Sequence, residues 1–235
     1  NDLAELFRAQ MQAHPQYMQI RLIGAGDHGL ERVRVDRDGH RLLRIDRAKL
    51  QEKSHYAYLF ETLNLAPGQI RLSPIVINRE LGAHSGLGKP TLHVSTPVAD
   101  AGGRVVGALV INVDLDQMFD QLKSDLPSHY QVYLSNRWGD LLIHPDHRRT
   151  FGFDQGRRLF IQDEFADVAR LLEGGGETSL ISRHETVDSG LVAAFVRLSV
   201  NTGNSERFII LGLAQPESHV LAETSRLGQR IVQVV

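Results

Sequence analysis

Apolar residues recur along the chain with two periods, about 3.6 residues and two residues, which predict a few helices among many strands. The first 15 residues have the helical period and stop at a proline. Residues 17–45 alternate with period two and are broken by two glycine-containing turns, so they predict three strands. The helical period returns over 46–65, and a strand is predicted at 69–80.

A hairpin is predicted at 91–114, after a glycine-rich loop. Its turn is Ala101-Gly102-Gly103, and its second arm is β-branched and apolar on both faces, which predicts a strand at the centre of a sheet. Because this turn leads into a strand and not into a helix, we interpret it as a hairpin turn rather than a phosphate-binding loop. The acidic segment at 114–126 then predicts a helix.

The pattern starts again at Tyr130. "YMQIRLIGAGD" at 17–27 and "YQVYLSNRWGD" at 130–140 share a tyrosine, an alternating strand and a Gly-Asp pair at the same spacing. The hairpin has a counterpart at 190–218, which also leads into a predicted helix. We therefore predict an α+β protein of two tandem modules, each a mostly antiparallel sheet flanked by helices, with a long helix at the N-terminus.

The composition argues against several classes of binding partner and of site chemistry. A net charge of −2 and a pI of about 6.6 argue against nucleic acid or an anionic membrane surface. The chain has no cysteine, which excludes disulfides, thiolate nucleophiles and cysteine-ligated zinc and slightly favours an oxidising compartment. No run of about 18 apolar residues is present that could span a bilayer.

Both ends of the chain suggest that it was excised from a longer, membrane-anchored protein. It begins at Asn1 within a helical pattern and ends in an uncapped apolar segment, so we expect flanking helices that continue toward the membrane. This C-terminal segment has a heptad seam. The seam predicts either a homodimer through the N- and C-terminal helices or one helix packed on its own domain. Its residues are Val220, Thr224, Leu227, Ile231 and Val234.

Three short segments are candidates for catalysis or cofactor binding, and none has the required pattern. The glycines at 24–29 precede a strand, whereas a dinucleotide fingerprint needs a helix there. His144, Asp146 and His147 lie in a proline-containing segment without the helical spacing of metal ligands. The Ser-Gly pairs in the first and second modules lack the strand-to-helix elbow of a nucleophilic serine. We expect no cofactor, no metal and no catalytic residue.

Polar side chains on three predicted elements of the first module suggest a binding pocket. One face of the strand at 91–98 is polar, the strand at 69–80 adds serine and arginines, and the segment at 46–65 adds lysine and two tyrosines. Such a set suits a small anionic or zwitterionic ligand. The candidate ligand-binding residues are Lys53, Tyr56, Tyr58, Ser73, Arg79, His93 and Ser95.

The order of these segments resembles the tandem PAS-like extracytoplasmic sensors called double Cache, or PDC, domains of bacterial histidine kinases, diguanylate cyclases and chemoreceptors. "GQIRLSPIVINRE" and "PTLHVSTPVAD" are similar to the sensor-kinase and cyclase branch. In the amino-acid-binding branch an aspartate in Pro-x-x-Asp binds the ligand, and Asp100 in "PVAD" matches it. Tyr56 and Tyr58 lie near the position of that branch's aromatic cluster. The Arg-x-Trp of that cluster is missing, because Trp138 lies in the second module, and the ligand is left open.

The resemblance implies a periplasmic small-molecule sensing domain of a transmembrane receptor, either a two-component histidine kinase or a diguanylate cyclase, without catalysis of its own. A free periplasmic solute-binding protein and a periplasmic hydrolase are the alternatives. The resemblance also implies five parts. These are an N-terminal helix (1–15), a membrane-distal ligand-binding module (16–115), a connecting helix (116–125), a membrane-proximal module (126–217) and an exit helix toward the membrane (218–235).

Overall fold

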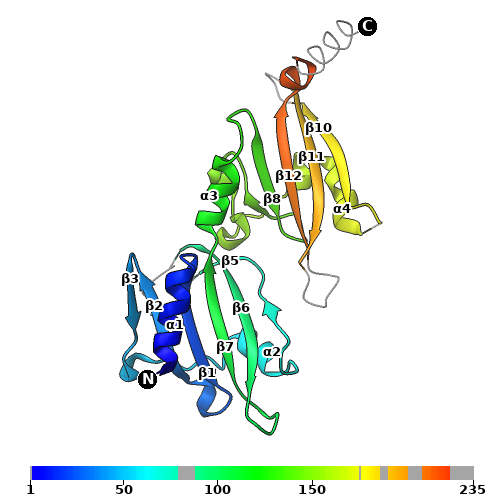
Figure 1. Cartoon of the computed structure of the whole chain (residues 1–235). Helices are drawn as coiled ribbons and strands as arrows, with labels where there is room; N and C mark the ends of the chain where they lie inside the picture. Colours follow the sequence, from blue (N-terminus) through cyan, green and yellow to red (C-terminus); the bar gives the residue numbers. More distant parts are fainter. Residues whose placement is uncertain (1, 79–87, 175, 186–189, 201–207, 223–235) are drawn as a thin grey trace, which may run out of the picture. The chain divides into compact units, whose positions relative to one another are not determined.

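The computed structural model describes residues 2–78, 88–174, 176–185, 190–200 and 208–222. The chain forms two compact units, Asn1–Met118 and Phe119–Val235. Each unit is built on one antiparallel sheet with helices packed against it (Figure 1). The predicted α+β fold of two sheet modules is therefore confirmed.

The first unit contains a seven-stranded sheet in the order β3-β2-β1-β7-β6-β4, with β5 also paired to β6. All neighbouring strands are antiparallel. β7 lies in the interior of this sheet between β1 and β6, as its apolar character on both faces predicts. The strands are β1 (Tyr17–Gly24), β2 (Glu31–Asp38), β3 (Arg41–Arg44), β4 (Arg71–Leu72), β5 (Val76–Ile77), β6 (Pro90–Ala99) and β7 (Val105–Asp114).

Helix α1 (Asp2–Ala13) covers one face of this sheet. Its buried side chains are spaced by three and four residues, so they form one apolar stripe along the helix. This stripe packs on alternate residues of three strands, β1, β2 and β7. The core on this face consists of Ala4, Phe7, Met11, Ile20 and Val35, with Leu22, Val33, Leu109 and Ile111 partly buried around it.

Helix α2 (Ala57–Leu63) covers the opposite face, and this face is largely polar. Ala108 and Val110 alternate with the residues beneath α1, and they pack on Tyr58 and Leu59 of α2. The rest of this face is buried but not apolar. Its buried polar residues include Gln19, Arg21, Arg34, Asp36, His93, Ser95 and Asn112.

The second unit repeats the strand order of the first. Its sheet runs β10-β11-β12-β8-β9, which matches β4-β6-β7-β1-β2 strand for strand. The two modules predicted from the repeated sequence pattern thus share one topology. Helix α3 (Asp116–Ser124) includes the boundary between the units. The elements that follow are β8 (Gln131–Ser135), β9 (Leu141–Ile143), α4 (Ala169–Glu173), β10 (Ser179–Glu185), β11 (Gly190–Ser199) and β12 (Phe208–Pro216). Residues 217–222 are helical.

Two predicted elements are shorter in the structure. The helix predicted over 46–65 is present only as α2, after a 3-10 turn at Arg47–Lys49. The segment between them is extended because it pairs with the start of β2, where the Glu31 amide donates to the Gln51 carbonyl at 3.0 Å. The strand predicted over 69–80 divides into β4 and β5, because Pro74 has no amide hydrogen with which to continue the ladder.

Several predictions concern residues outside those that the structure describes. They include the turn of the hairpin predicted at 190–218, most of the C-terminal heptad seam and the candidate site residue Arg79. Within the described part of the chain, no helix is both long and apolar enough to cross a membrane.

Candidate ligand-binding site

The first unit contains a cavity of about 360 Å³ beside α2 and strands β4 to β6. It lies at the break between β4 and β5, where the chain leaves the edge of β6 after Ser73 and pairs with it again at Val76. More than half of its lining is apolar or aromatic. The lining residues are Tyr56, Ala57, Tyr58, Arg71, Ser73, Pro74, Val76, Ile77, Asn78 and His93.

Three rings in a row form one wall of this pocket. Tyr56 stacks on Tyr58 with ring centroids 5.4 Å apart, and Tyr58 stacks on His93 at 5.1 Å. Tyr56 has an extended backbone and directly precedes α2. Because the backbone changes there from extended to helical, the side chains of Tyr56 and Tyr58 lie on the same side although they are two positions apart. Stacked rings present a flat apolar surface with polar edges, which suits the apolar body of a small organic molecule.

Paired backbone groups hold the polar floor in place. The Ser73 amide donates to the His93 carbonyl at 2.9 Å, and the Ser73 hydroxyl accepts the His93 amide at 2.9 Å. The same hydroxyl donates to the Pro74 carbonyl at 2.7 Å. His93 is buried, so its orientation between the Tyr58 ring and β4 is fixed by packing and by this ladder.

Arg71 is the only residue with a permanent charge among the described residues that line the pocket. Its guanidinium is buried and its Nε donates to the Glu61 carboxylate. Its Nη1 is buried and has no hydrogen-bond partner among the described residues. A buried, charged donor without a partner costs roughly 1–3 kcal/mol or more, which an oxyanion in the pocket would recover.

A buried charge network lies directly behind the aromatic wall. The Arg21 guanidinium lies over the Tyr58 ring at 5.2 Å and Lys53 Nζ lies over the Tyr56 ring at 5.1 Å. Both cations also approach the Glu31 carboxylate, Arg21 at 3.4 Å and Lys53 at 4.0 Å. Arg34 adds a third cation, 3.4 Å from Glu31.

Asp36 adds a second carboxylate to this network, because it pairs with Arg34 at 2.6 Å and also accepts a hydrogen bond from Gln19. Burial lowers the pKa of Arg34, but its hydrogen bond to Asp36 and the charges of Asp36 and Glu31 outweigh this effect, so the net pKa is raised.

The structure brings four of the eight candidate residues to the pocket, Tyr56, Tyr58, Ser73 and His93. Lys53 lies behind the wall in the charge network. Ser95 is buried, and its hydroxyl bonds to Thr62 of α2 at 2.6 Å, so it holds the helix on the sheet.

Asp100 does not line the pocket. Its carboxylate lies in the β6–β7 turn and accepts the amides of Gly102 and Arg104, both at 3.0 Å. It therefore stabilises the turn.

The sequence-based choice missed Asn78 and the apolar residues of β5. Arg71 is a polar residue of the predicted strand but was not among the candidates. The proline within that strand could have indicated a break, and a break is what exposes these side chains to one cavity.

In the second unit, the candidate metal residues have structural roles. His144 Nε2 lies 2.9 Å from Glu164, and His144 Nδ1 accepts the Asp146 amide at 2.9 Å. Asp146 pairs with Arg148, whose hydrogen bonds lower the pKa of this carboxyl to about 2. No group of three His, Asp or Glu side chains within the described residues could hold a metal ion.

Residues 1–161 match the family model of the bacterial histidine kinase sensor domain. The chain belongs to this family. It is therefore a sensor domain, as predicted from its resemblance to double Cache receptors. No curated protein matches the sequence.

Solved structures with the same fold come from several kinds of receptor. A domain of a protein assigned to the sensory box/GGDEF family of Vibrio parahaemolyticus is 18% identical, with a TM-score of 0.70, 92% of this chain and 78% of that chain covered. The periplasmic sensory domain of the Campylobacter jejuni chemoreceptor Tlp1 is 12% identical, with a TM-score of 0.66 and coverages of 94% and 79%.

The ligand-binding domain of the Pseudomonas fluorescens chemoreceptor CtaA, solved with L-leucine, is 13% identical with a TM-score of 0.54. The match covers 90% of this chain and 76% of that chain. These folds, together with the family, agree with the predicted periplasmic location and sensing role.

Proposed function

We propose that the first unit senses a small organic anion, which binds in the pocket between α2 and strands β4 to β6 and is not chemically changed there. The observation that carries this proposal is Arg71, which lines an otherwise largely apolar cavity and whose buried Nη1 has no hydrogen-bond partner among the described residues. The aromatic wall would hold the apolar body of the ligand, and Arg71 would bind its carboxylate. The L-leucine in the CtaA complex likewise joins one carboxylate to an apolar side chain, with an ammonium group in addition.

Ligand binding would be transmitted through the strands to the helices at the ends of the first unit. Thr91 and His93 on β6 pair with Asp114 and Asn112 on β7. Asp114 accepts the Asp116 amide at 2.9 Å at the start of α3. A ligand that favours one arrangement of β6 therefore shifts the population of arrangements at this helix start.

The assignment of the modules relative to the membrane extends this proposal. Residues 16–115 would be the membrane-distal module and 126–217 the membrane-proximal one, joined by a connecting helix and preceded and followed by helices toward the membrane. A homodimer through the N- and C-terminal helices is part of the same proposal. A histidine kinase is the expected output.

A thermal-shift screen tests the ligand class. Small carboxylates and amino acids are each compared with the corresponding primary amide, which keeps the shape and removes the charge. We expect acids to raise the melting temperature and amides to have little effect. At 100 times its dissociation constant, a ligand stabilises the fold by about 2.7 kcal/mol.

The variant Arg71→Gln tests the site itself. Loss of a charge-assisted hydrogen bond should weaken binding of a selected acid about tenfold to a hundredfold. Arg41→Gln is the matched control, because this side chain is 76% exposed on β3 and does not line the pocket. An Arg71→Gln protein that is folded and binds the acid as tightly as the parent would show that the pocket is wrongly assigned.

A further inference from the structure

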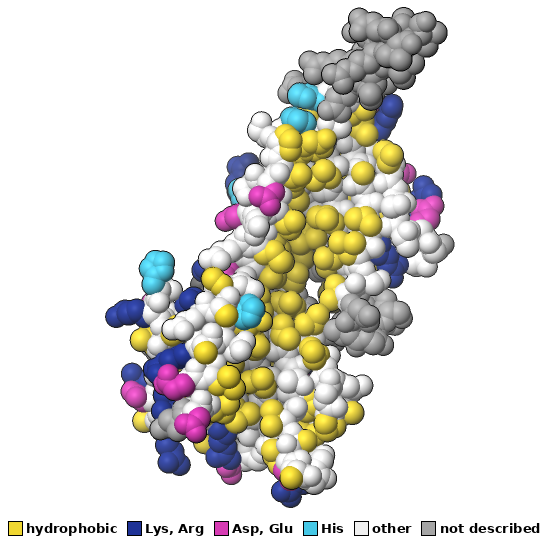
Figure 2. Space-filling model, viewed as in Figure 1, with side chains coloured by type: hydrophobic (Ala, Val, Ile, Leu, Met, Phe, Trp, Pro, Cys, Tyr) yellow, Lys and Arg dark blue, Asp and Glu magenta, His cyan; other side chains and the backbone are white. Residues whose placement is uncertain are grey.

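The ion pair of Glu61 on α2 with Arg71 on β4 differs from the exposed ion pairs of the first unit. Figure 2 shows Lys and Arg side chains, with acidic ones among them, at the part of this unit where β2 and β3 lie. In such pairs, for example Arg41 with Asp38, both side chains are exposed, so water screens the attraction. The Arg71 side chain is only 8% exposed, whereas that of Glu61 is 46% exposed. A buried cation thus pairs here with a half-exposed carboxylate.

Two consecutive residues of α2 contact two paired residues of the sheet. Arg71 on β4 lies opposite Ser95 on β6. Glu61 accepts a hydrogen bond from Arg71 Nε. The next residue of the helix, Thr62, is joined to Ser95 by a hydrogen bond of 2.6 Å between their hydroxyls, and both side chains are buried. The Glu61 carboxylate is therefore held beside Arg71 by the packing of α2 on the sheet as well as by its charge.

Glu61 engages one side of the Arg71 guanidinium and leaves the other. A guanidinium binds a carboxylate with two N–H groups, either through Nε and one Nη or through both Nη nitrogens. Glu61 accepts from Nε, while Nη1 is buried and has no hydrogen-bond partner among the described residues. Because Arg71 lines the pocket beside the aromatic wall, the end with the two Nη nitrogens is the one left for an anion in that pocket.

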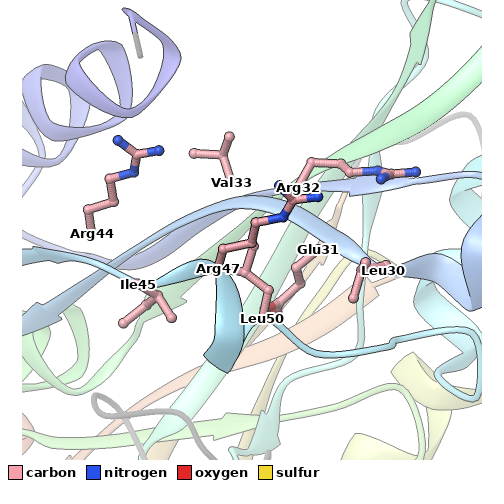
Figure 3. A pocket seen from close by; sticks show the side chains of 8 residues that line it. All are labelled: Leu30, Glu31, Arg32, Val33, Arg44, Ile45, Arg47 and Leu50. Atoms are coloured by element: carbon pink, nitrogen blue, oxygen red, sulfur yellow. The ribbon is translucent and has the colours of Figure 1, made fainter.

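Glu31, the acid at another cavity of the first unit, has a different role. This cavity, of about 320 Å³, lies at the edge of β2, and Glu31 is among the side chains that line it (Figure 3). The Glu31 side chain is fully buried and lies within 4.0 Å of three buried cations, so it stabilises the fold. Glu61 is half exposed and has one cationic partner among the described residues. Its removal should cost the fold less, so an effect on binding can be measured.

We propose that Glu61 is a positioning residue of the pocket, which fixes Arg71 through Nε so that the two Nη nitrogens bind the carboxylate of the ligand. This inference rests on the ligand-binding role proposed above for Arg71. A guanidinium that is already oriented loses less conformational freedom when the ligand binds, and this strengthens binding.

Glu61 also repels an anion, and substitutions separate this effect from positioning. The repulsion is screened by water because Glu61 is half exposed, whereas its hydrogen bond orients a buried group. Glu61→Gln removes the charge but keeps an oxygen that can accept from Nε, and Glu61→Ala removes both. Positioning therefore predicts weaker binding by the alanine variant than by the glutamine variant, whereas repulsion predicts that both variants bind more tightly than the parent.

Titration calorimetry of the whole 235-residue chain with 4-methylpentanoate and with benzoate, at constant ionic strength, tests this role. Each probe joins one carboxylate to an apolar body. We expect Glu61→Ala to weaken binding about tenfold and Glu61→Gln to change it less than about threefold. Glu5→Ala is the matched control, because Glu5 also pairs with an arginine from a helix, but on α1 at the opposite face of the sheet. The melting temperature without a probe verifies that each variant is folded.

A second comparison uses the Arg71→Gln background, in which Glu61→Ala should have no further effect because Glu61 acts through Arg71. A purely structural role of Glu61 would weaken binding in both backgrounds. The inference is wrong if Glu61→Ala binds a probe as tightly as the parent or more tightly. It is also wrong if Glu61→Gln or Glu5→Ala weakens binding as much as Glu61→Ala does.

Failure of this inference is distinguishable from failure of the proposed function. If Arg71→Gln weakens binding and Glu61→Ala does not, only the role of Glu61 is wrong. If Arg71→Gln leaves binding unchanged, or if neither probe binds the parent at millimolar concentrations, the ligand-binding role of Arg71 is wrong and the role of Glu61 with it.

Discussion

The two units share one strand order, but they fill the sheet face beneath their covering helices in opposite ways. In the first unit this face carries buried polar and charged side chains, among them Arg21, His93 and Asn112. In the second unit aromatic and aliphatic side chains, among them Phe165 and Phe195, fill the core. The same topology thus supports a polar sheet face beside a cavity in one module and an apolar core in the other.

In the second unit, aromatic side chains fill the core over the sheet because one of them packs closely against a glycine. Phe195 on β11 lies opposite Gly212 on β12, and a Cβ atom at Gly212 would lie 2.2 Å from the Phe195 ring. The ring also contacts Phe165 edge to face, with centroids 4.9 Å apart. The first unit places Val110 and Asn112 on its central strand and lays the Tyr58 and His93 rings over this face. We infer that the second unit contributes stability and that the first contributes recognition.

Removing the Phe195 ring from the core of the second unit should cause the largest loss of stability. We expect Phe195→Ala to lower the free energy of unfolding of that unit by about 3–5 kcal/mol, because it leaves a cavity in a fully buried core. Urea unfolding followed by the fluorescence of Trp138, the single tryptophan, reports on this unit alone. Phe60→Ala, at a side chain 70% exposed in the first unit, is the control and should change little. A loss below about 1 kcal/mol for Phe195→Ala would contradict the closed-core description.

Glu31→Gln should cause the next largest loss of stability, and this loss should be confined to the first unit. It leaves Arg21, Arg34 and Lys53 with one carboxylate fewer, and breaking a buried ion pair costs about 3 kcal/mol or more. We expect the circular-dichroism unfolding transition of the first unit to move to lower urea, while the Trp138 transition stays in place. Glu5→Gln, at an exposed carboxylate on α1, is the matched control. If both transitions moved together, the units would unfold as one and the comparison between them would not hold in solution.

Sequence patterns predicted the α+β fold of two sheet modules, because strand alternation and the repeated tyrosine-strand-Gly-Asp segment are local signals. They identified which residues share a face, such as His93 and Ser95, but not that this polar face is buried. That burial depends on pairing between distant residues, for example Arg21 with Glu31 and Asn112, which no local period encodes. For Asp100 a motif match predicts a ligand contact, and the structure shows that its carboxylate accepts two amides of the β6–β7 turn.

Acid should destabilise the second unit by a smaller amount, through Glu164. Burial raises the pKa of this carboxyl, but the hydrogen bond and charge of His144 and the charge of Arg149 outweigh it, so the net pKa lies below its ordinary value of 4.5. A carboxyl with a depressed pKa stabilises the fold above its unfolded pKa, and this stability is lost as the pH falls through the folded value. The Trp138 transition should therefore move to lower urea as the pH falls below 4.5.

Glu164→Gln should flatten this dependence, whereas Glu173→Gln, at an exposed residue of α4, should leave it unchanged. An equal acid dependence of the parent and Glu164→Gln would assign the effect to other carboxylates. The acid dependence of the Trp138 transition thus tests the interactions that hold Glu164 between His144 and Arg149, without any change to a core side chain.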